Sequence, residues 1–264
     1  MQNYGKLIGA LAAASALVAG NAQAVEVNYD LHVGYSSDYL FRGLNLGSDL
    51  YEGGVDVSSE VGGLNLSAGA WYGSYELSNG AAGQSNVIGL GDDTLQANEL
   101  DLYAQVAKDF GFVTAAVGYI YYDQQGAVLK TYVGDAQEVY FSLSRDFGFA
   151  AASLTYYWDI DGQVNKGDND GYTALAVTKG FELNQCLTLN VGGTLGYLAE
   201  EGHLSHLTGK VSLDYAFAEH AKISPYVAAS LDLSGGHGNA SQYYVNTDAQ
   251  KNELVGGVIL SSSF

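Results

Sequence analysis

The feature that most constrains the fold is an alternation of apolar and polar residues with a period of two, clearest between Leu100 and Tyr122. Apolar side chains occupy every second position there, on either side of a short turn at 109–112. Successive residues of a β-strand point to opposite faces, so the pattern predicts two strands, each with one apolar and one polar face. Two such runs around a short glycine-containing turn predict a β-hairpin.

The hairpin pattern is repeated along the chain. A second unit lies between Val139 and Trp158, and its turn at 146–149 has the same residues, Asp-Phe-Gly-Phe, as the turn at 109–112. Further alternating runs begin at Val27 and end at Phe264. Together they predict about twelve strands, joined in hairpins that account for nearly the whole chain after residue 24.

The first 24 residues are typical of a secretory signal peptide. Lys6 precedes an apolar run over 7–19, and Ala22 to Ala24 supply small residues for cleavage. That run is shorter than the roughly 20 apolar residues of a membrane helix, and no later run is long enough. Any membrane integration must therefore use strands. We predict a signal peptide at 1–24 and one transmembrane β-barrel at 25–264.

The predicted connections alternate between long and short. Polar stretches at 43–50, 78–97 and 235–250 are long, whereas the turn at 62–63 is short. This asymmetry is typical of outer-membrane barrels, which have short periplasmic turns, longer outer loops and two aromatic girdles. Closure is required because an open sheet edge in lipid leaves backbone groups unpaired. The sequence therefore predicts an all-β, closed, antiparallel transmembrane β-barrel in the outer membrane of a Gram-negative bacterium.

Composition supports this interpretation over a soluble β-sandwich, which would also alternate. The chain has 21 tyrosines, which suit membrane interfaces, and a single proline. Because proline cannot donate to a sheet ladder, Pro225 is expected at a strand start or in a bulge. Removing the signal peptide takes away Lys6 and no acid, so the formal net charge changes from −19 to −20. Such a surface repels nucleic acid, which excludes a nucleic-acid partner.

Two segments resemble a known family. The run Ser-Ser-Asp-Tyr-Leu-Phe-Arg-Gly at 36–43, followed by Gly-Gly-Val-Asp at 53–56, resembles the opening of the TorF family of porin-like proteobacterial outer-membrane proteins. The ending Ser-Ser-Ser-Phe is similar to the terminal strand that the barrel-assembly machinery reads in most outer-membrane barrels. The resemblance implies a barrel with a pore, and it implies that Phe264 completes the membrane assembly signal. It supplies neither a substrate nor catalytic residues.

The polar faces carry the candidate site. If the apolar parity contacts lipid, the opposite parity faces the lumen. Its charged residues are predicted to line the pore or its mouths: Asp30, Asp38, Arg42, Glu52, Asp56, Glu60, Glu99, Asp101, Glu138, Lys210, Asp214, Asp232 and Glu253. Most are acidic, and rings of carboxylates concentrate cations. Barrels of about 8 strands are filled by side chains and those of 16–18 are open, so a twelve-stranded lumen could be either.

Arg42 is the notable cation of this set. Four strand residues span about 13 Å, so Arg42 cannot pair with Asp38 along the same strand. We expect it to pair across strands, with Glu52 or Asp56, and so to fix the register.

Two further motifs offer weaker chemistry. The acidic loop 159–171 could hold calcium, but it lacks the spacing and the bidentate glutamate of an EF-hand, so no metal site is predicted. His203 and Ser205 share a strand face, as in some outer-membrane phospholipases, but no asparagine of matching parity would orient the histidine. We therefore expect no catalytic residues and no enzymatic activity.

The function predicted from the sequence is that of an outer-membrane porin for the passive diffusion of small cationic or neutral solutes. No cofactor is expected. The expected partners are outer-membrane lipid and lipopolysaccharide, the barrel-assembly machinery and small solutes. The alternative is a closed structural or adhesive barrel that acts through its outer loops.

Overall fold

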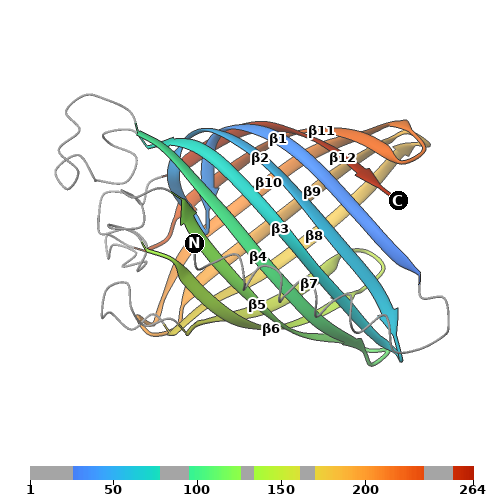
Figure 1. Ribbon diagram of the computed structural model, residues 1–264, viewed down its shortest axis with the longest axis horizontal. Coiled ribbons are helices and arrows are strands. Elements are labelled where there is room, and N and C mark those ends of the chain that lie inside the picture. Colours follow the sequence, from blue (N-terminus) through green and yellow to red (C-terminus); the bar gives the residue numbers. More distant parts are fainter. Residues whose placement is uncertain (1–25, 78–94, 126–133, 161–169, 235–251) are drawn as a thin grey trace, which may run out of the picture.

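The computed structural model describes residues 26–77, 95–125, 134–160, 170–234 and 252–264. Each strand pairs antiparallel with its neighbours in the sequence, and β1 pairs with β12, which closes the sheet into a barrel (Figure 1). The strands are β1 (Val27–Phe41), β2 (Leu44–Val61), β3 (Leu64–Leu77), β4 (Leu95–Asp109), β5 (Thr114–Gln125), β6 (Ala136–Asp146), β7 (Ala151–Asp159), β8 (Asp170–Asn184), β9 (Leu187–Leu198), β10 (His203–Ala218), β11 (Ala221–Asp232) and β12 (Glu253–Ser263). The predicted closed barrel of about twelve antiparallel strands is confirmed. Within the described ranges, no helix is long and apolar enough to cross a membrane.

The outer wall of the barrel is apolar. Leu31, Val117 and Leu143 are among many large apolar side chains that remain exposed on it, Leu143 to 51%. Aromatic side chains gather at the short-turn end, where Phe149 is 74% exposed. Exposed apolar surface on this scale is unfavourable in water, whereas an apolar band flanked by aromatic residues suits the hydrocarbon layer of a membrane.

The connections differ at the two ends of the barrel. At one end they are uniformly short: 62–63, 110–113, 147–150, 185–186 and 219–220. At the other end, four of the connections span ten residues or more of the sequence, but β1 and β2 are joined by Arg42 and Gly43 alone. The loop predicted at 43–50 is therefore wrong. Both turn residues have positive φ, 49° at Arg42 and 83° at Gly43, as a two-residue hairpin turn requires.

Two details concern the ladder. Tyr29 and Phe264 exchange backbone hydrogen bonds of 3.0 and 2.9 Å, which hold the end of the seam between β1 and β12. Pro225 lies in the middle of β11, opposite Val258 of β12, so its predicted place at a strand start or bulge is wrong. On its β10 side the pairing is interrupted between Ser212 and Tyr215, which accommodates the missing N–H.

The outer ends of β1 and β2 leave the wall and fold into the lumen. We call residues 38–50 the inward hairpin. Register irregularities mark its start on both strands, after Asp38 in β1 and before Tyr51 in β2. Its apolar side chains pack on the inner faces of β3 and β4, where Tyr75 is fully buried. The cluster comprises Tyr39, Leu44, Leu46, Leu50, Tyr75, Leu77 and Ala97. The buried core of the described residues thus lies inside the barrel.

Candidate functional site: the barrel lumen and the inward hairpin

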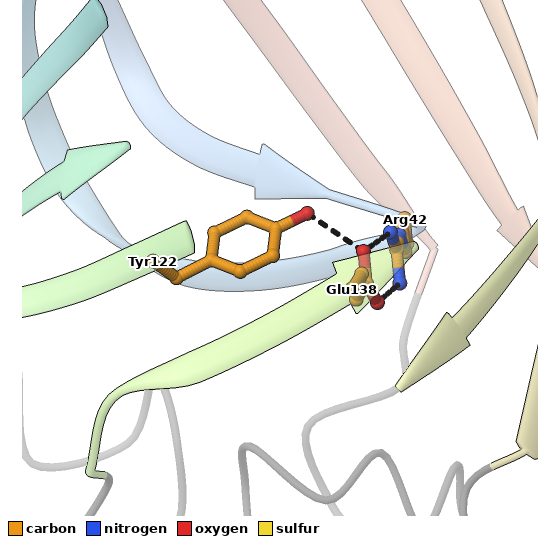
Figure 2. A network of polar contacts seen from close by, with 3 residues as sticks. All are labelled: Arg42, Tyr122 and Glu138. Carbon is orange, nitrogen blue, oxygen red and sulfur yellow. Dashed lines mark hydrogen bonds and ion pairs between the residues drawn. The ribbon is translucent and has the colours of Figure 1, made fainter. Parts of the chain in front are cut away.

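The tip of the inward hairpin reaches the opposite wall of the barrel. Nη1 and Nη2 of Arg42 donate to Oε1 and Oε2 of Glu138 on β6, at 2.7 and 2.6 Å. Tyr122 on β5 donates its hydroxyl to Oε2 of the same carboxylate at 2.9 Å (Figure 2). The Glu138 side chain is only 4% exposed. A bidentate, buried guanidinium–carboxylate pair is a strong and directional contact, so it fixes the hairpin at one point of the wall.

Aromatic rings complete the surroundings of the Arg42 guanidinium. Its central carbon lies 4.4 Å from the ring centroid of Tyr157 on β7, 4.5 Å from that of Tyr172 on β8 and 4.9 Å from that of Phe41. The rings of Tyr157 and Tyr172 are neighbours, with centroids 5.8 Å apart. Cations are attracted to ring faces at such distances, most strongly where water is excluded. The wall groups therefore surround the planar Arg42 cation with a carboxylate and two ring faces.

A line of hydrogen bonds holds the wall next to this site. The hydroxyl of Tyr172 and Nε2 of His206 are 2.9 Å apart, and Nδ1 of His206 lies 2.8 Å from Oγ1 of Thr208. Thr208 continues the line to Ser230 on β11 at 2.8 Å. Gly43 lies directly against His206, because a Cβ added to it would be 2.4 Å from Cγ of the imidazole. The turn and the wall are thus in close contact on this side too.

Polar contacts also fix the base of the inward hairpin. Nδ2 of Asn45 donates to Asp38 at 3.0 Å and to Glu253 of β12 at 3.4 Å. In addition, Nε1 of Trp71 donates to Glu52 at 2.8 Å, and the Trp71 ring packs on Tyr39 with centroids 5.6 Å apart. The hairpin is therefore anchored at its tip and at its base.

The pairing predicted for Arg42 is wrong. Its partner is neither Glu52 nor Asp56 on the neighbouring strand but Glu138, 96 residues away in the sequence. The prediction assumed that Arg42 stays in the wall. Once the hairpin folds inward, its tip meets strands on the far side of the barrel.

The other residues predicted to line the pore lie on the wall strands. Apart from Asp38 and Arg42, they alternate with outward-facing neighbours and point inward or toward the mouths. Sequence reasoning missed Lys222, whose Nζ lies 2.8 Å from Oδ2 of Asp214. Lys222 directly precedes Ile223, whose side chain faces outward, so the alternation along the strand identifies Lys222 as lumenal.

Several lumenal carboxylates lie close to other polar groups. Asp30 and Asp56 face each other directly in the β1–β2 register. The hydroxyl of Tyr103 donates to Asp56 at 2.7 Å, and that of Ser263 donates to Asp30. Asp101 and Glu99 on β4 differ, because Oδ1 of Asp101 and Oε2 of Glu99 are buried and have no hydrogen-bond partner among the described residues. An unpaired buried oxygen is costly, and a cationic or hydrogen-bonding group would satisfy it.

Two cavities lie beside the inward hairpin, of about 510 and 560 Å³. The first is lined by Arg42, Asp101 and the tyrosines around them, and the second by Glu52 and Lys210. They share Leu40 and Trp71 in their linings, so they adjoin around the hairpin. Each has the size of a site for a small solute.

The two motifs with weaker chemistry in the sequence are the acidic loop 159–171 and the pair His203 and Ser205. Asp161 and Asp168 of the acidic loop lie outside the described residues, and no group of metal-binding side chains occurs among the residues that are described. Nε2 of His203 lies 2.6 Å from Glu201, and Nδ1 lies 3.0 Å from the carbonyl oxygen of Leu204. Ser205 is buried, so it is not presented to lipid as a phospholipase nucleophile would be.

Solved structures with a similar fold are outer-membrane barrels. An outer membrane channel from Pseudomonas putida F1 is 10% identical, with a TM-score of 0.51 over 92% of this chain and 97% of that chain. The NanC porin is 14% identical, with a TM-score of 0.50 over 89% and 98%. An active-site mutant of outer membrane phospholipase A from Escherichia coli is 13% identical, with a TM-score of 0.49 over 92% and 93%.

At these low identities, the similarity to the Pseudomonas putida channel and to the NanC porin establishes the fold alone, which is that of outer-membrane channel barrels. No protein-family model matches the chain, and a search of curated proteins finds no relative. The resemblance to the TorF family therefore stays a prediction.

Proposed function

We propose that this protein is an outer-membrane channel for the passive diffusion of small cationic or neutral solutes, inserted after removal of residues 1–24. The observation that carries the proposal is an apolar outer wall enclosing an acid-lined lumen with solute-sized cavities. Outer-membrane lipid and lipopolysaccharide would surround it. Side chains of one dominant sign inside a low-dielectric wall raise the local concentration of counter-ions.

The sign of the lumenal charge supports a preference for cations. Two of the lumenal basic residues described, Arg42 and Lys222, are each paired with a carboxylate. Lys210 lies with its Nζ 3.9 Å from the ring centroid of Tyr226. The remaining acids, including Asp30, Asp56 and Glu60, therefore leave a net negative lumen.

Ion selectivity tests this proposal. We would measure the reversal potential of the refolded barrel in a planar bilayer under a potassium chloride gradient. The triple variant D30N, D56N and E60Q should move the reversal potential toward zero. The control is E219Q, because Glu219 lies in the 219–220 turn outside the strands and its side chain is 89% exposed. At about 1 M salt the screening length falls to about 3 Å, so selectivity should weaken.

Two outcomes would overturn the cation preference. One is an anion-selective wild type, and the other is a triple variant with an unchanged reversal potential.

The inward hairpin favours one second candidate, a closed structural or adhesive barrel that acts through its outer loops. The hairpin fills part of the lumen and is anchored at both tip and base. A wild-type barrel that conducts no ions, while its heat-modifiable migration shows it to be folded, would favour this candidate.

We also propose that Phe264 completes the signal read by the barrel-assembly machinery. Its side chain is 63% exposed, and its ring stacks on that of His220 with centroids 5.9 Å apart. Deleting Phe264 should leave the protein in the periplasm, degraded or aggregated, because the terminal aromatic residue and part of the seam are both lost. Normal amounts in the outer membrane after the deletion would contradict this role.

A further inference from the structure

The wall groups around Arg42 form a site that the hairpin occupies with its own side chain. We infer that this site, made by Glu138, Tyr122, Tyr157 and Tyr172, binds the guanidinium group of a small organic cation in place of Arg42, and that binding releases the inward hairpin. The inference deepens the proposed channel function, on which it rests for the route by which the solute arrives.

The site does not depend on the hairpin for its shape. Glu138 is oriented by the hydroxyl of Tyr122, and both residues belong to wall strands, β6 and β5. Tyr157 and Tyr172 pack against each other on β7 and β8, and Tyr172 is held by His206. Several groups described above contact the guanidinium. Of these, Phe41 alone belongs to the hairpin and would leave with it. A vacated site would keep its carboxylate and two ring faces, the groups that recognise a guanidinium.

The adjoining cavity provides room for the rest of a solute. It measures about 510 Å³ and is lined by Arg42, Tyr122, Tyr157 and Tyr172, together with Asp101. Asp101 adds a second carboxyl group to the lining of this cavity. A solute with a guanidinium at one end and an amine at the other could satisfy both acids. The chemistry therefore points to a guanidino-amine rather than to a simple alkylamine.

The geometry of the turn gives an external ligand an advantage over Arg42. Arg42 adopts φ of 49°, in the left-handed region that residues with a Cβ occupy at an energetic cost. This conformation belongs to the two-residue turn, so its cost is relieved when the inward hairpin is released. A free guanidinium reaches the same carboxylate without this strain.

Calorimetric titration with agmatine, a guanidino-amine, tests the inference on the detergent-solubilised mature barrel. R42A vacates the site, so it should bind agmatine about tenfold more tightly than the wild type, because the apparent affinity scales with the fraction of molecules whose site is open. R42A combined with E138Q should lose this gain. Putrescine, which has an amine in place of the guanidinium, should bind R42A more weakly than agmatine does.

K108A is the matched control. It also removes one positive charge that lies over an aromatic ring, with Nζ 5.5 Å from the centroid of Phe110, but on the outer wall. Its affinity for agmatine should equal that of the wild type. A folded R42A that binds agmatine no more tightly than the wild type, or a gain that survives E138Q, would overturn the inference.

If R42A does not fold, the wild type carries the test. Agmatine, but not putrescine, should speed amide hydrogen exchange in the inward hairpin, residues 38–50, and an unchanged exchange rate would overturn the inference. Both readouts are independent of conductance. A barrel that binds agmatine without conducting ions would refute the channel and keep the site, whereas one that conducts but does not bind would refute the site alone.

Discussion

The hairpin formed by β4 and β5 and the inward hairpin at the ends of β1 and β2 are both antiparallel pairs of strands joined by a short turn, but only the first stays in the wall. Pairing between β4 and β5 runs without a shift from Asn98–Gln125 to Asp109–Thr114. In the inward hairpin the register shifts on both strands. Val117 of the wall hairpin is 44% exposed, whereas Leu46 of the inward hairpin is 3% exposed.

The difference shows what period-two alternation reports. A wall strand has lipid on one face and the lumen on the other, so its two faces need side chains of opposite polarity. The inward hairpin is covered by protein on one face and meets the opposite wall at its tip. It therefore combines packed apolar side chains with a charged tip that needs its own partner. Its stability should depend on specific contacts that the wall hairpin does not need.

The largest expected effect concerns the ion pair at the tip. Glu138→Ala should lower the free energy of unfolding by about 3–5 kcal/mol, because it leaves the buried Arg42 guanidinium without its carboxylate. Asp214→Ala removes the acid of the other lumenal pair, but Lys222 is 48% exposed, so the expected loss is about 0–1 kcal/mol. Urea unfolding in detergent, followed by tryptophan fluorescence, measures both. Equal losses would remove the distinction between an anchored tip and an ordinary lumenal pair.

The next effect concerns apolar packing. Leu46→Ala should cost about 2–5 kcal/mol, since it removes transfer energy and also leaves a cavity inside the protein. Leu31→Ala, on the lipid-facing side of β1, should cost only the transfer part, because lipid fills the vacated space. The same unfolding experiment in lipid–detergent micelles compares the two. If Leu31→Ala proves as damaging as Leu46→Ala, the inward hairpin is no better packed than the wall.

The smallest effect compares two glycines with the same φ angle. Gly43 and Gly111 both have φ of 83°, so alanine is strained at either position by about 1–2 kcal/mol. A Cβ at Gly111 meets open space, whereas one at Gly43 would clash with His206. Gly43→Ala should therefore cost about 1–3 kcal/mol more than Gly111→Ala, the usual penalty of overpacking. Thermal unfolding resolves the difference, and identical midpoints would show that the turn does not rest on His206.

The wall could be predicted from the sequence because its rule is local. Alternation and short turns determine each hairpin, and closure follows from the need to pair every edge in lipid. The same parity rule predicted that Asp56 and Asp101 face the lumen. The parity rule does not predict the inward hairpin, because Gly43, Asn45 and Gly47 give this segment the composition of a loop.

The contact between Arg42 and Glu138 could not be predicted from the local sequence. Arg42 and Glu138 are 96 residues apart, and nothing in either neighbourhood indicates the partner. Their pairing follows from where the barrel carries β6 once the sheet closes. Lys222, in contrast, could have been found, since it directly precedes the outward-facing Ile223.

The most direct test of the account is the single-channel conductance of a charge-neutral double variant, R42A with E138A. It removes the tether of the inward hairpin without changing the net lumenal charge, so a change in conductance reports geometry rather than electrostatics. The matched control, K222A with D214A, removes the other lumenal pair in the same way. We expect a several-fold higher conductance for R42A with E138A than for the wild type, and a value near the wild type for the control. Equal conductance of the wild type and the R42A–E138A variant would contradict the claim that this pair holds the hairpin across the lumen.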